Sequence, residues 1–201
     1  DLTYSYEYLG SGPRTLGQIL SRSHMFAKLM DAAQRPMLIL GQGALARPDG
    51  SVVLTTARNL ATRFGMVDHG WNGFNVLHGA AARVGALDLG FVPGEGGCDV
   101  AGILNGAASG KIEVVYLLGA DEIDTASLGS AFVIYQGHHG DAGASAADVV
   151  LPGAAYTEKD ATYVNTEGRV QQTRLAVHPP GQARTDWMIL RALSQALGQK
   201  A

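Results

Sequence analysis

The stretch DVVLPGAAYTEKDATYVNTEGRVQQT, residues 148–173, says most about how this chain folds. It opens with a short apolar run at 149–151, which ends at Pro152, a residue that cannot donate a hydrogen bond within a sheet. The remainder mixes tyrosine, valine and threonine with charged and amide side chains. A solvated linker does not need that mixture, so we expect a buried strand followed by an ordered loop that packs against a core.

Three more apolar runs precede this stretch, and a glycine follows each of them closely. Short runs without polar alternation are typical of parallel strands that are buried on both faces. The segments between them have the spacing of helices. The alternation predicts an α/β fold, in which a layered, mostly parallel, Rossmann-like sheet has flanking helices. The expected strands are 37–40, 114–118, 132–135 and 149–151, and the expected helices are 15–34, 49–64, 74–88, 99–108 and 185–197.

Two of the expected helices combine an apolar face with an acidic residue at the start. Asp49 is placed to cap the helix that follows it. Asp186 falls in the first turn of the last helix, where the helix dipole favours an anion. The residues expected to face inward are Val52, Val53, Leu60 and Ala61 in the first of these helices and Trp187, Ile189, Leu190, Leu193 and Leu197 in the last.

The beginning of the chain differs from the rest because it is rich in tyrosine and lacks helical spacing. Residues 1–15 therefore predict an extended arm from a neighbouring domain, and residues 16–201 predict one α/β domain. The chain begins with Asp and not with Met. From this we expect a fragment of a larger subunit.

Composition excludes several classes of function. The 201 residues are 46% hydrophobic and 16% charged, which is globular, and the net charge of −3 offers no basic face for nucleic acid. No apolar run approaches the ~18 residues that a membrane span needs, so we expect no direct membrane insertion. The one cysteine, Cys98, excludes a disulfide framework and a cysteine-ligated iron–sulfur cluster within this chain.

The glycine-rich loop after the first expected strand has the spacing G-x-G-x-x-A at residues 41–46, and an acidic residue, Asp68, follows further on. This pattern resembles a dinucleotide-binding fingerprint, which keeps a stand-alone NAD-binding module as a rival interpretation. In that fingerprint the loop enters the helix directly, because the helix amides hold the pyrophosphate. Residues 47–49 intervene here, so we favour a tight strand-to-helix turn.

Other polar groups also lie at expected strand ends, where parallel sheets form a crevice. His138, His139 and Asp141 are a weak metal site, because adjacent side chains usually point apart and a metal needs at least three convergent ligands. Glu158 with Lys159, and Glu167 with Arg169, look like paired charges that pin a loop. No serine lies in a nucleophile elbow. We therefore expect no catalytic residue and no metal site.

Several motifs also carry a family resemblance. ADVVLP and YTEKDATYVNTEGRVQ resemble the molybdopterin oxidoreductases. Together with YLLGADEID and YQGHHGD they resemble the C-terminal part of the large iron–sulfur subunit of respiratory complex I, which is found in the bacterial enzyme and, as the 75-kDa subunit, in mitochondria. The resemblance runs from DLTYSYEYLG to DWMILRALSQALG, nearly the whole chain.

This resemblance implies a retained fold without a retained cofactor. In cofactor-bearing relatives the strand-end loops hold a pterin, whereas the complex I subunit is regarded as having lost the molybdenum site. The resemblance thus implies a vestigial pocket and no cofactor in this segment, with 2Fe-2S and 4Fe-4S clusters in the N-terminal part of the parent subunit. The residues expected at the pocket are Gly41, Gly43, Gln136, His138, Glu158, Asn165 and Arg169.

The implied function is structural. The segment would scaffold the peripheral arm of a proton-pumping NADH–quinone oxidoreductase, with other subunits of that arm as partners. It would lie at the cytoplasmic face of a bacterial inner membrane or on the mitochondrial matrix side. The alternative is a fragment of a molybdopterin enzyme of the formate dehydrogenase or nitrate reductase type.

Overall fold

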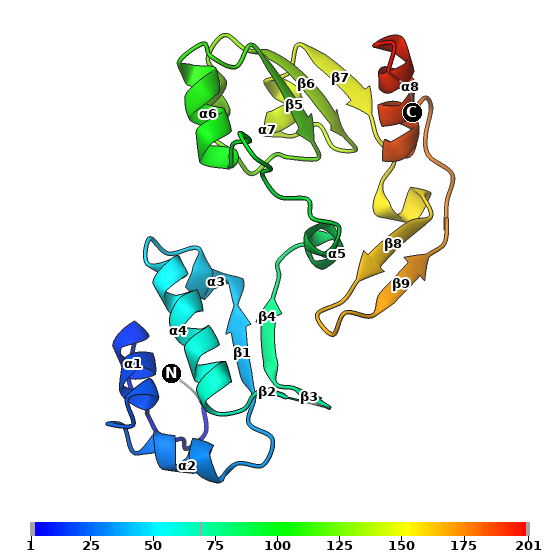
Figure 1. The fold of residues 1–201 in the computed structure, drawn as a ribbon. Helices are drawn as coiled ribbons and strands as arrows, with labels where there is room; N and C mark the ends of the chain where they lie inside the picture. Colours follow the sequence, from blue (N-terminus) through cyan, green and yellow to red (C-terminus); the bar gives the residue numbers. More distant parts are fainter. Residues whose placement is uncertain (1–2, 69, 200–201) are drawn as a thin grey trace. The chain divides into compact units, whose positions relative to one another are not determined.

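A computed structural model of the chain describes residues 3–68 and 70–199, and in it helices alternate with short strands (Figure 1). The chain divides into two compact units. The first comprises residues 1–84 with 164–169, and the second comprises 85–163 with 170–201.

The first unit contains a two-stranded parallel sheet with helices against one face. β1 pairs with β4 so that Leu38 lies beside Phe74 and Leu40 beside Val76. These side chains pack on the buried face of α4. A small antiparallel pair, β2 with β3, leads into β4. The elements are α1 (Pro13–Leu20), α2 (Phe26–Ala32), β1 (Leu38–Gly41), α3 (Gln42–Leu45), α4 (Gly50–Arg63), β2 (Val67–Asp68), β3 (Trp71–Asn72) and β4 (Phe74–Leu77).

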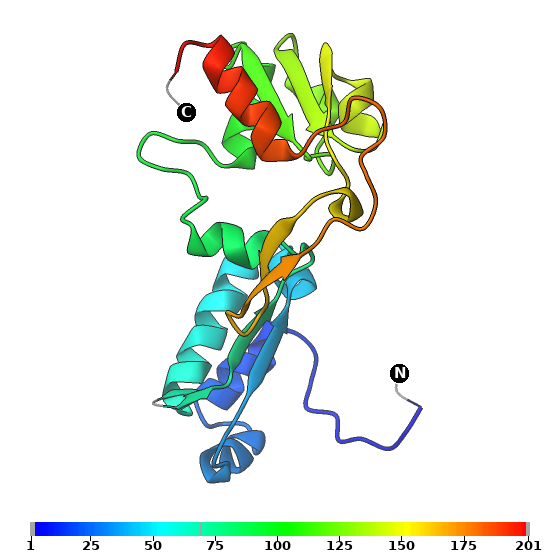
Figure 2. The same ribbon diagram turned by 90° about the vertical axis from the view of Figure 1, so that its right-hand side faces the viewer.

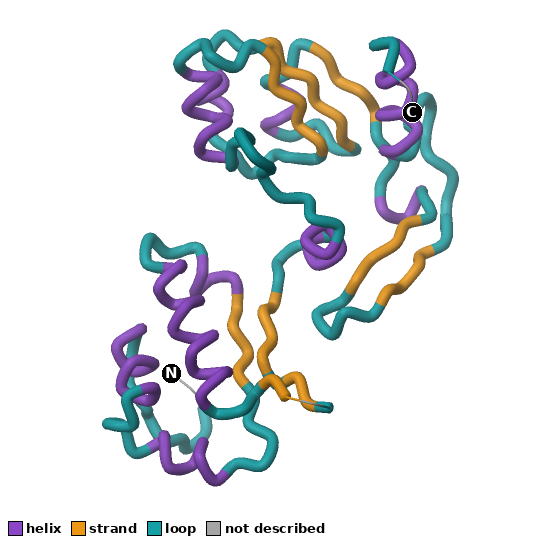
Figure 3. The backbone as a smooth tube through the Cα atoms, in the orientation of Figure 1, coloured by secondary structure: helices purple, strands orange, loops and turns teal. Residues whose placement is uncertain are grey.

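The second unit is built on a three-stranded parallel sheet in the order β5–β6–β7. Parallel strands need crossover connections, and the short helical segments between them supply these. Figure 3 distinguishes the strands from the helices and loops that connect them. The elements are α5 (Arg83–Asp88), α6 (Val100–Ala108), β5 (Val114–Leu118), η1 (Thr125–Leu128), β6 (Phe132–Gly137), α7 (Ala142–Ser145), β7 (Val149–Pro152), η2 (Tyr156–Glu158), β8 (Ala161–Val164), β9 (Val170–Thr173) and α8 (Asp186–Ala196).

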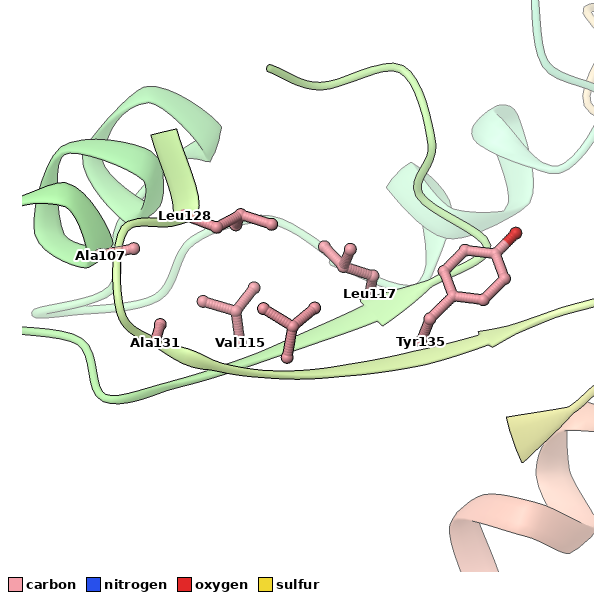
Figure 4. Packing of buried hydrophobic residues seen from close by; sticks show 7 residues of the cluster. Ala107, Val115, Leu117, Leu128, Ala131 and Tyr135 are labelled. Carbon is pink, nitrogen blue, oxygen red and sulfur yellow. The ribbon is translucent and has the colours of Figure 1, made fainter. Parts of the chain in front are cut away.

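One face of the β5–β6–β7 sheet forms the core of the second unit (Figure 4). Alternate residues of each strand point to the same face. Val115 and Leu117 of β5 therefore join Val133 and Tyr135 of β6 in packing toward Ala107 of α6. Leu128 of η1 and Ala131 complete this cluster of buried residues.

The opposite face of this sheet meets the last helix, α8. Gln136 is next to Tyr135 in β6 and therefore points to the other side of the sheet. Its side chain bonds Asp186, the first residue of α8. Figures 1 and 2 show α6 and α8 on opposite sides of the sheet, so the unit has three layers. This confirms the α/β fold with parallel sheets and flanking helices.

An antiparallel hairpin, β8 with β9, follows the sheet. Its turn is fixed by Asn165, whose Oδ1 accepts hydrogen bonds from the backbone N–H groups of Glu167 and Arg169 at 3.0 and 2.9 Å. Gly168 has φ +79° in this turn. That angle is in the left-handed region, which glycine adopts without the steric cost that a Cβ would bring.

Two expected helices are wrong. The range 74–88 begins as strand β4, because Phe74 and Val76 alternate toward the core beside β1, and only Arg83–Asp88 is helical. The range 15–34 is divided into α1 and α2. Arg22 between them has φ +63°, which a continuous right-handed helix does not allow.

The expected inner faces are only partly correct. In α4, Val53 is 4% exposed, whereas Val52 is 60% exposed and points away from the sheet. In α8, Ile189 and Leu193 are half-buried, but Trp187, Leu190 and Leu197 are exposed. Asp49 precedes α4 but its carboxylate bonds Arg47 and not a helix N–H group.

The division into an arm and one domain stays a prediction. Within the described part of the expected arm, residues 3–12 have no helix or strand, but α1 already begins at Pro13. Residues 1 and 2 lie outside the described residues.

Candidate functional site

A buried polar network lies where β6 ends. Gln136 is 0% exposed, and its Nε2 donates a hydrogen bond to Oδ1 of Asp186 at 2.9 Å. The Gln136 Oε1 accepts a hydrogen bond from the hydroxyl of Tyr116. The second carboxylate oxygen of Asp186 accepts from the ammonium group of Lys159. We call these four residues the Gln136 network.

Each member of the Gln136 network is positioned by a regular element. Leu118 of β5 lies beside Gln136 in the sheet, and Tyr116, two residues earlier, points to the same face. Asp186 is held at the first position of α8, where the helix dipole stabilises a carboxylate. Lys159 follows η2 and reaches the same carboxylate. Four segments of the second unit are thus tied together: strands β5 and β6, the loop after η2, and helix α8.

The network keeps Asp186 ionised. Burial opposes the charge of this carboxyl group, but the hydrogen bonds from Lys159 and Gln136 and the positive charge of Lys159 outweigh burial, so the pKa of Asp186 lies below its ordinary value. Burial, and then the negative charge of Asp186, raise the pKa of Tyr116. The phenol therefore stays protonated and remains a donor to Gln136.

The Gln136 network is joined by hydrogen bonds among its own side chains. Both oxygens of Asp186 already accept hydrogen bonds, and the side-chain oxygen of Gln136 accepts one as well. A general base must be free to take a proton from a substrate. Within the described part of the chain, Thr185 Oγ1 is the buried side-chain polar atom that has no hydrogen-bond partner.

A separate pocket of about 440 Å³ opens at the carboxyl ends of β6 and β7. His138, His139 and Glu158 line it. The two imidazole rings are close, with centroids 4.5 Å apart in an edge-to-face arrangement, although adjacent side chains usually point apart. Oε2 of Glu158 accepts a hydrogen bond from the backbone N–H of Ala155 at 2.9 Å, so this carboxylate is tied to its own turn.

The glycine-rich loop lies in the first unit. Gly41 ends β1, and the four-residue helix α3 begins immediately after it. Neither Gly41 nor Gly43 has a positive φ, and a Cβ at either position would meet no atom within 4 Å. The amide Nε2 of Gln42 lies 2.9 Å from Nδ1 of His78. The loop is therefore an ordinary turn whose geometry other residues could adopt.

The residues expected at a vestigial pocket are divided between the two units. His138 and Glu158 share the strand-end pocket, and Gln136 is buried in the network. Asn165 and Arg169 are in the hairpin turn, which groups with the first unit, as do Gly41 and Gly43. One pocket that contains all seven residues stays a prediction.

Sequence reasoning missed the partnership at the centre of the network. It placed Asp186 in the first turn of the last helix but did not pair it with Gln136, which is 50 residues away. It also treated Lys159 as a partner of Glu158, whereas Lys159 bonds Asp186. Tyr116 provided no signal beyond being a polar residue within an apolar strand.

The described residues contain no cluster of three or more His, Cys, Asp or Glu side chains that could hold a metal ion. Within the same described ranges, no helix has the length and the apolar character that crossing a membrane requires.

Comparison with known proteins reveals consistent similarities. Residues 1–196 match the family model of the molybdopterin oxidoreductases. The chain is 46% identical to the NADH-ubiquinone oxidoreductase 75 kDa subunit of Reclinomonas americana and 46% identical to the 78 kDa mitochondrial subunit of Neurospora crassa. It is 40% identical to an NADH-quinone oxidoreductase subunit of Rickettsia bellii.

These alignments cover 100%, 98% and 97% of this chain but only 28%, 26% and 27% of the three relatives. The chain therefore spans about a quarter of the length of the curated relatives that it matches. The similarity confirms the resemblance that the sequence motifs indicated. Because the family model covers nearly every residue, the chain belongs to the molybdopterin oxidoreductase family.

Proposed function

We propose that this chain is a structural segment of the large iron–sulfur subunit of a proton-pumping NADH–quinone oxidoreductase. The whole complex transfers electrons from NADH through flavin and iron–sulfur clusters to quinone. This segment contributes a folded scaffold to the peripheral arm and binds no cluster. The clusters, 2Fe-2S and 4Fe-4S, belong to another part of the same subunit.

The observation that carries this proposal is the continuous similarity to subunits of that oxidoreductase. Identity of 40–46% extends over 97–100% of the chain, so both units and the Gln136 network are included. Similarity over a whole chain at this level supports a common fold and a common place in the assembly. Other subunits of the peripheral arm are therefore its proposed partners, on the cytoplasmic face of a bacterial inner membrane or the matrix side in mitochondria.

The chemistry of the described side chains supports a structural role. The most buried polar residue, Gln136, serves to join strand β6 to helix α8. Asp186 and Lys159 neutralise one another within the same network. Buried polar networks in which every member has a partner stabilise one arrangement of a fold.

The family also implies a molybdenum–pterin group, and the strand-end pocket does not fit one. Of the described residues that line this pocket, Glu158 alone carries a fixed charge, and a carboxylate repels the phosphate of a pterin cofactor. Cys98, the only residue of this chain with a thiol for molybdenum, lines a different pocket beside Val100. The proposed role therefore includes no step at a pterin.

An immunoblot of source-cell extract on a native gel, stained in parallel for NADH oxidation, tests the proposal. The proposal predicts that the chain migrates with a large membrane-derived band that oxidises NADH. Migration with a smaller species without that activity would instead favour a molybdopterin enzyme of the formate dehydrogenase or nitrate reductase type. Molybdenum analysis of that smaller species would then decide.

A further inference from the structure

The segment that follows α5 contains the two most exposed large apolar side chains of the described residues. Leu89 is 89% exposed and Phe91 is 78% exposed, the highest values among the large hydrophobic residues described. Val92 and Val100 are also exposed. Isolated exposed apolar residues are ordinary, but a contiguous group of them marks a surface that binds a partner.

A pocket of about 380 Å³ lies within this segment, between the loop and the start of α6. Its wall is formed by Phe91, Val92, Val100 and Ile103, with Cys98 beside them. Asp99, the one charged residue of the described lining, uses its carboxylate to cap α6 by accepting a hydrogen bond from the N–H of Gly102 at 2.8 Å. The pocket therefore offers an apolar site for a bulky side chain.

The charged residues of this segment have one sign. Between Val84 and Gly110 the sequence contains no lysine, arginine or histidine, but it contains Asp88, Glu95 and Asp99. All three of these acidic residues are exposed. Asp99 lines the pocket, and Asp88 and Glu95 belong to the same segment. An apolar pocket in an acidic segment is complementary to an apolar side chain that lysine or arginine residues flank.

We propose that this surface, formed by Leu89, Phe91, Val92, Cys98 and Val100 in a segment that also carries three acidic residues, docks a basic and apolar segment of the same polypeptide. The proposal rests on the proposed function, in which this chain is part of a longer subunit. Its relatives are nearly four times as long, since the chain spans only 26–28% of them. A segment on the same polypeptide is held at a high effective concentration, on the order of millimolar for a short flexible link.

The charge also argues against two other occupants. A second copy of this chain would bring the same three carboxylates against one another, and like charges across an interface oppose association. A membrane surface with anionic lipids would be repelled in the same way. A basic segment is the occupant whose charge complements the acidic residues of this segment.

Cys98 allows a direct test, because it lines the pocket and its side chain is exposed in this segment. The full-length subunit is purified free of other subunits and treated with N-ethylmaleimide, and the peptide with Cys98 is followed by mass spectrometry. The control is Val52→Cys in the same subunit, since Val52 is 60% exposed and lies on α4 of the other unit. For each thiol, the alkylation rate in the folded subunit is divided by the alkylation rate of the same thiol in the urea-unfolded subunit. This ratio removes differences in intrinsic reactivity between the two thiols.

The proposal predicts that Cys98 reacts at least tenfold more slowly than the thiol introduced by Val52→Cys in the folded, free subunit. Phe91→Ser, or Asp88→Asn combined with Glu95→Gln, should abolish that protection, and added salt should weaken it in the unmodified subunit. Asp99 is left unchanged because it caps α6.

Three results would overturn the proposal. Equal rates for Cys98 and the introduced control thiol, in the free subunit and in the assembled complex, would show that nothing docks. Protection that arises only on assembly would assign the surface to another subunit. Protection that salt and charge neutralisation leave unchanged would exclude a basic occupant. Failure of the proposed function is a separate result, since it would show as the absence of NADH oxidation from the band that contains the subunit.

Discussion

The side-chain amide of Gln136 and the carboxylate of Asp186 are joined by a 2.9 Å hydrogen bond, although 50 residues separate them in the sequence. Gln136 lies near the end of the central strand of the three-stranded sheet and is fully buried, and Asp186 begins the last helix. This bond holds α8 against the sheet face opposite α6. It ties the central strand of the second unit to its last helix.

Replacing Gln136 with leucine should destabilise the chain by about 1–3 kcal/mol, because it leaves the Tyr116 hydroxyl and one oxygen of Asp186 without their buried partner. Urea unfolding at pH 7 measures this change. In a double-mutant cycle with Asp186→Asn, the two effects should be non-additive by at least about 0.5 kcal/mol, as expected of residues in one network. Additive effects would show that the two side chains do not interact in solution.

The Asp186 carboxyl group should make folding sensitive to acid. Its pKa is lower in the folded chain than in the unfolded chain, where an aspartate titrates near about 3.9. The carboxylate therefore stabilises the fold above that pH, and this stabilisation is lost as the pH falls through the lower, folded pKa. The free energy of unfolding of Asp186→Asn should depend less on pH below about pH 4. If the free energy of unfolding of the unmodified chain and of Asp186→Asn changed with pH in parallel, the lowered pKa of Asp186 would be contradicted.

Gly168→Val should destabilise the hairpin, because valine at the φ of +79° found here brings a branched Cβ into the left-handed region. The expected cost is at least about 1–2 kcal/mol. Gly140→Val is the matched control, since Gly140 has no positive φ and a Cβ there would meet no atom within 4 Å. Thermal melting of both variants checks the prediction. A similar melting temperature for the two would show that the turn does not need glycine.

Neighbouring valines of α4 should differ in their effect on stability. Val53 lies in the core with Leu40 and Ala57, whereas Val52 is mostly exposed. Val53→Ala should cost about 2 kcal/mol, since it removes two buried methyl groups and leaves a cavity. Val52→Ala should change the free energy of unfolding by less than about 0.5 kcal/mol. Equal costs would mean that α4 is rotated from the orientation described.

Much of the second unit could be predicted from the sequence because its signals are local. A proline or glycine follows each of the apolar runs that became β5, β6 and β7 within two residues, and Asp99 precedes α6 as a capping residue. The positive φ of Gly168 was also predictable from the turn sequence. These features depend on neighbours within a few residues, which is the range that propensity and capping describe.

Other features could not be read because distant segments determine them. Residues 74–77 look like the start of an alanine-rich helix, and their pairing with β1 overrides that tendency. The partnership of Gln136 with Asp186 depends on where α8 returns to the sheet, and no local pattern encodes that return. The residues expected at a vestigial pocket are likewise distant in sequence and belong to two units, so a single pocket that holds all of them stays a prediction.

The central claim is that this segment supports the complex without taking part in its chemistry. The most direct test is to introduce Asp186→Asn into the full-length subunit and to measure NADH–quinone turnover per assembled complex, with the amount of complex measured separately. We predict that less complex assembles and that each assembled complex turns over at the unmodified rate. A normal amount of complex whose turnover falls tenfold or more would contradict the claim and would place the Gln136 network in the reaction.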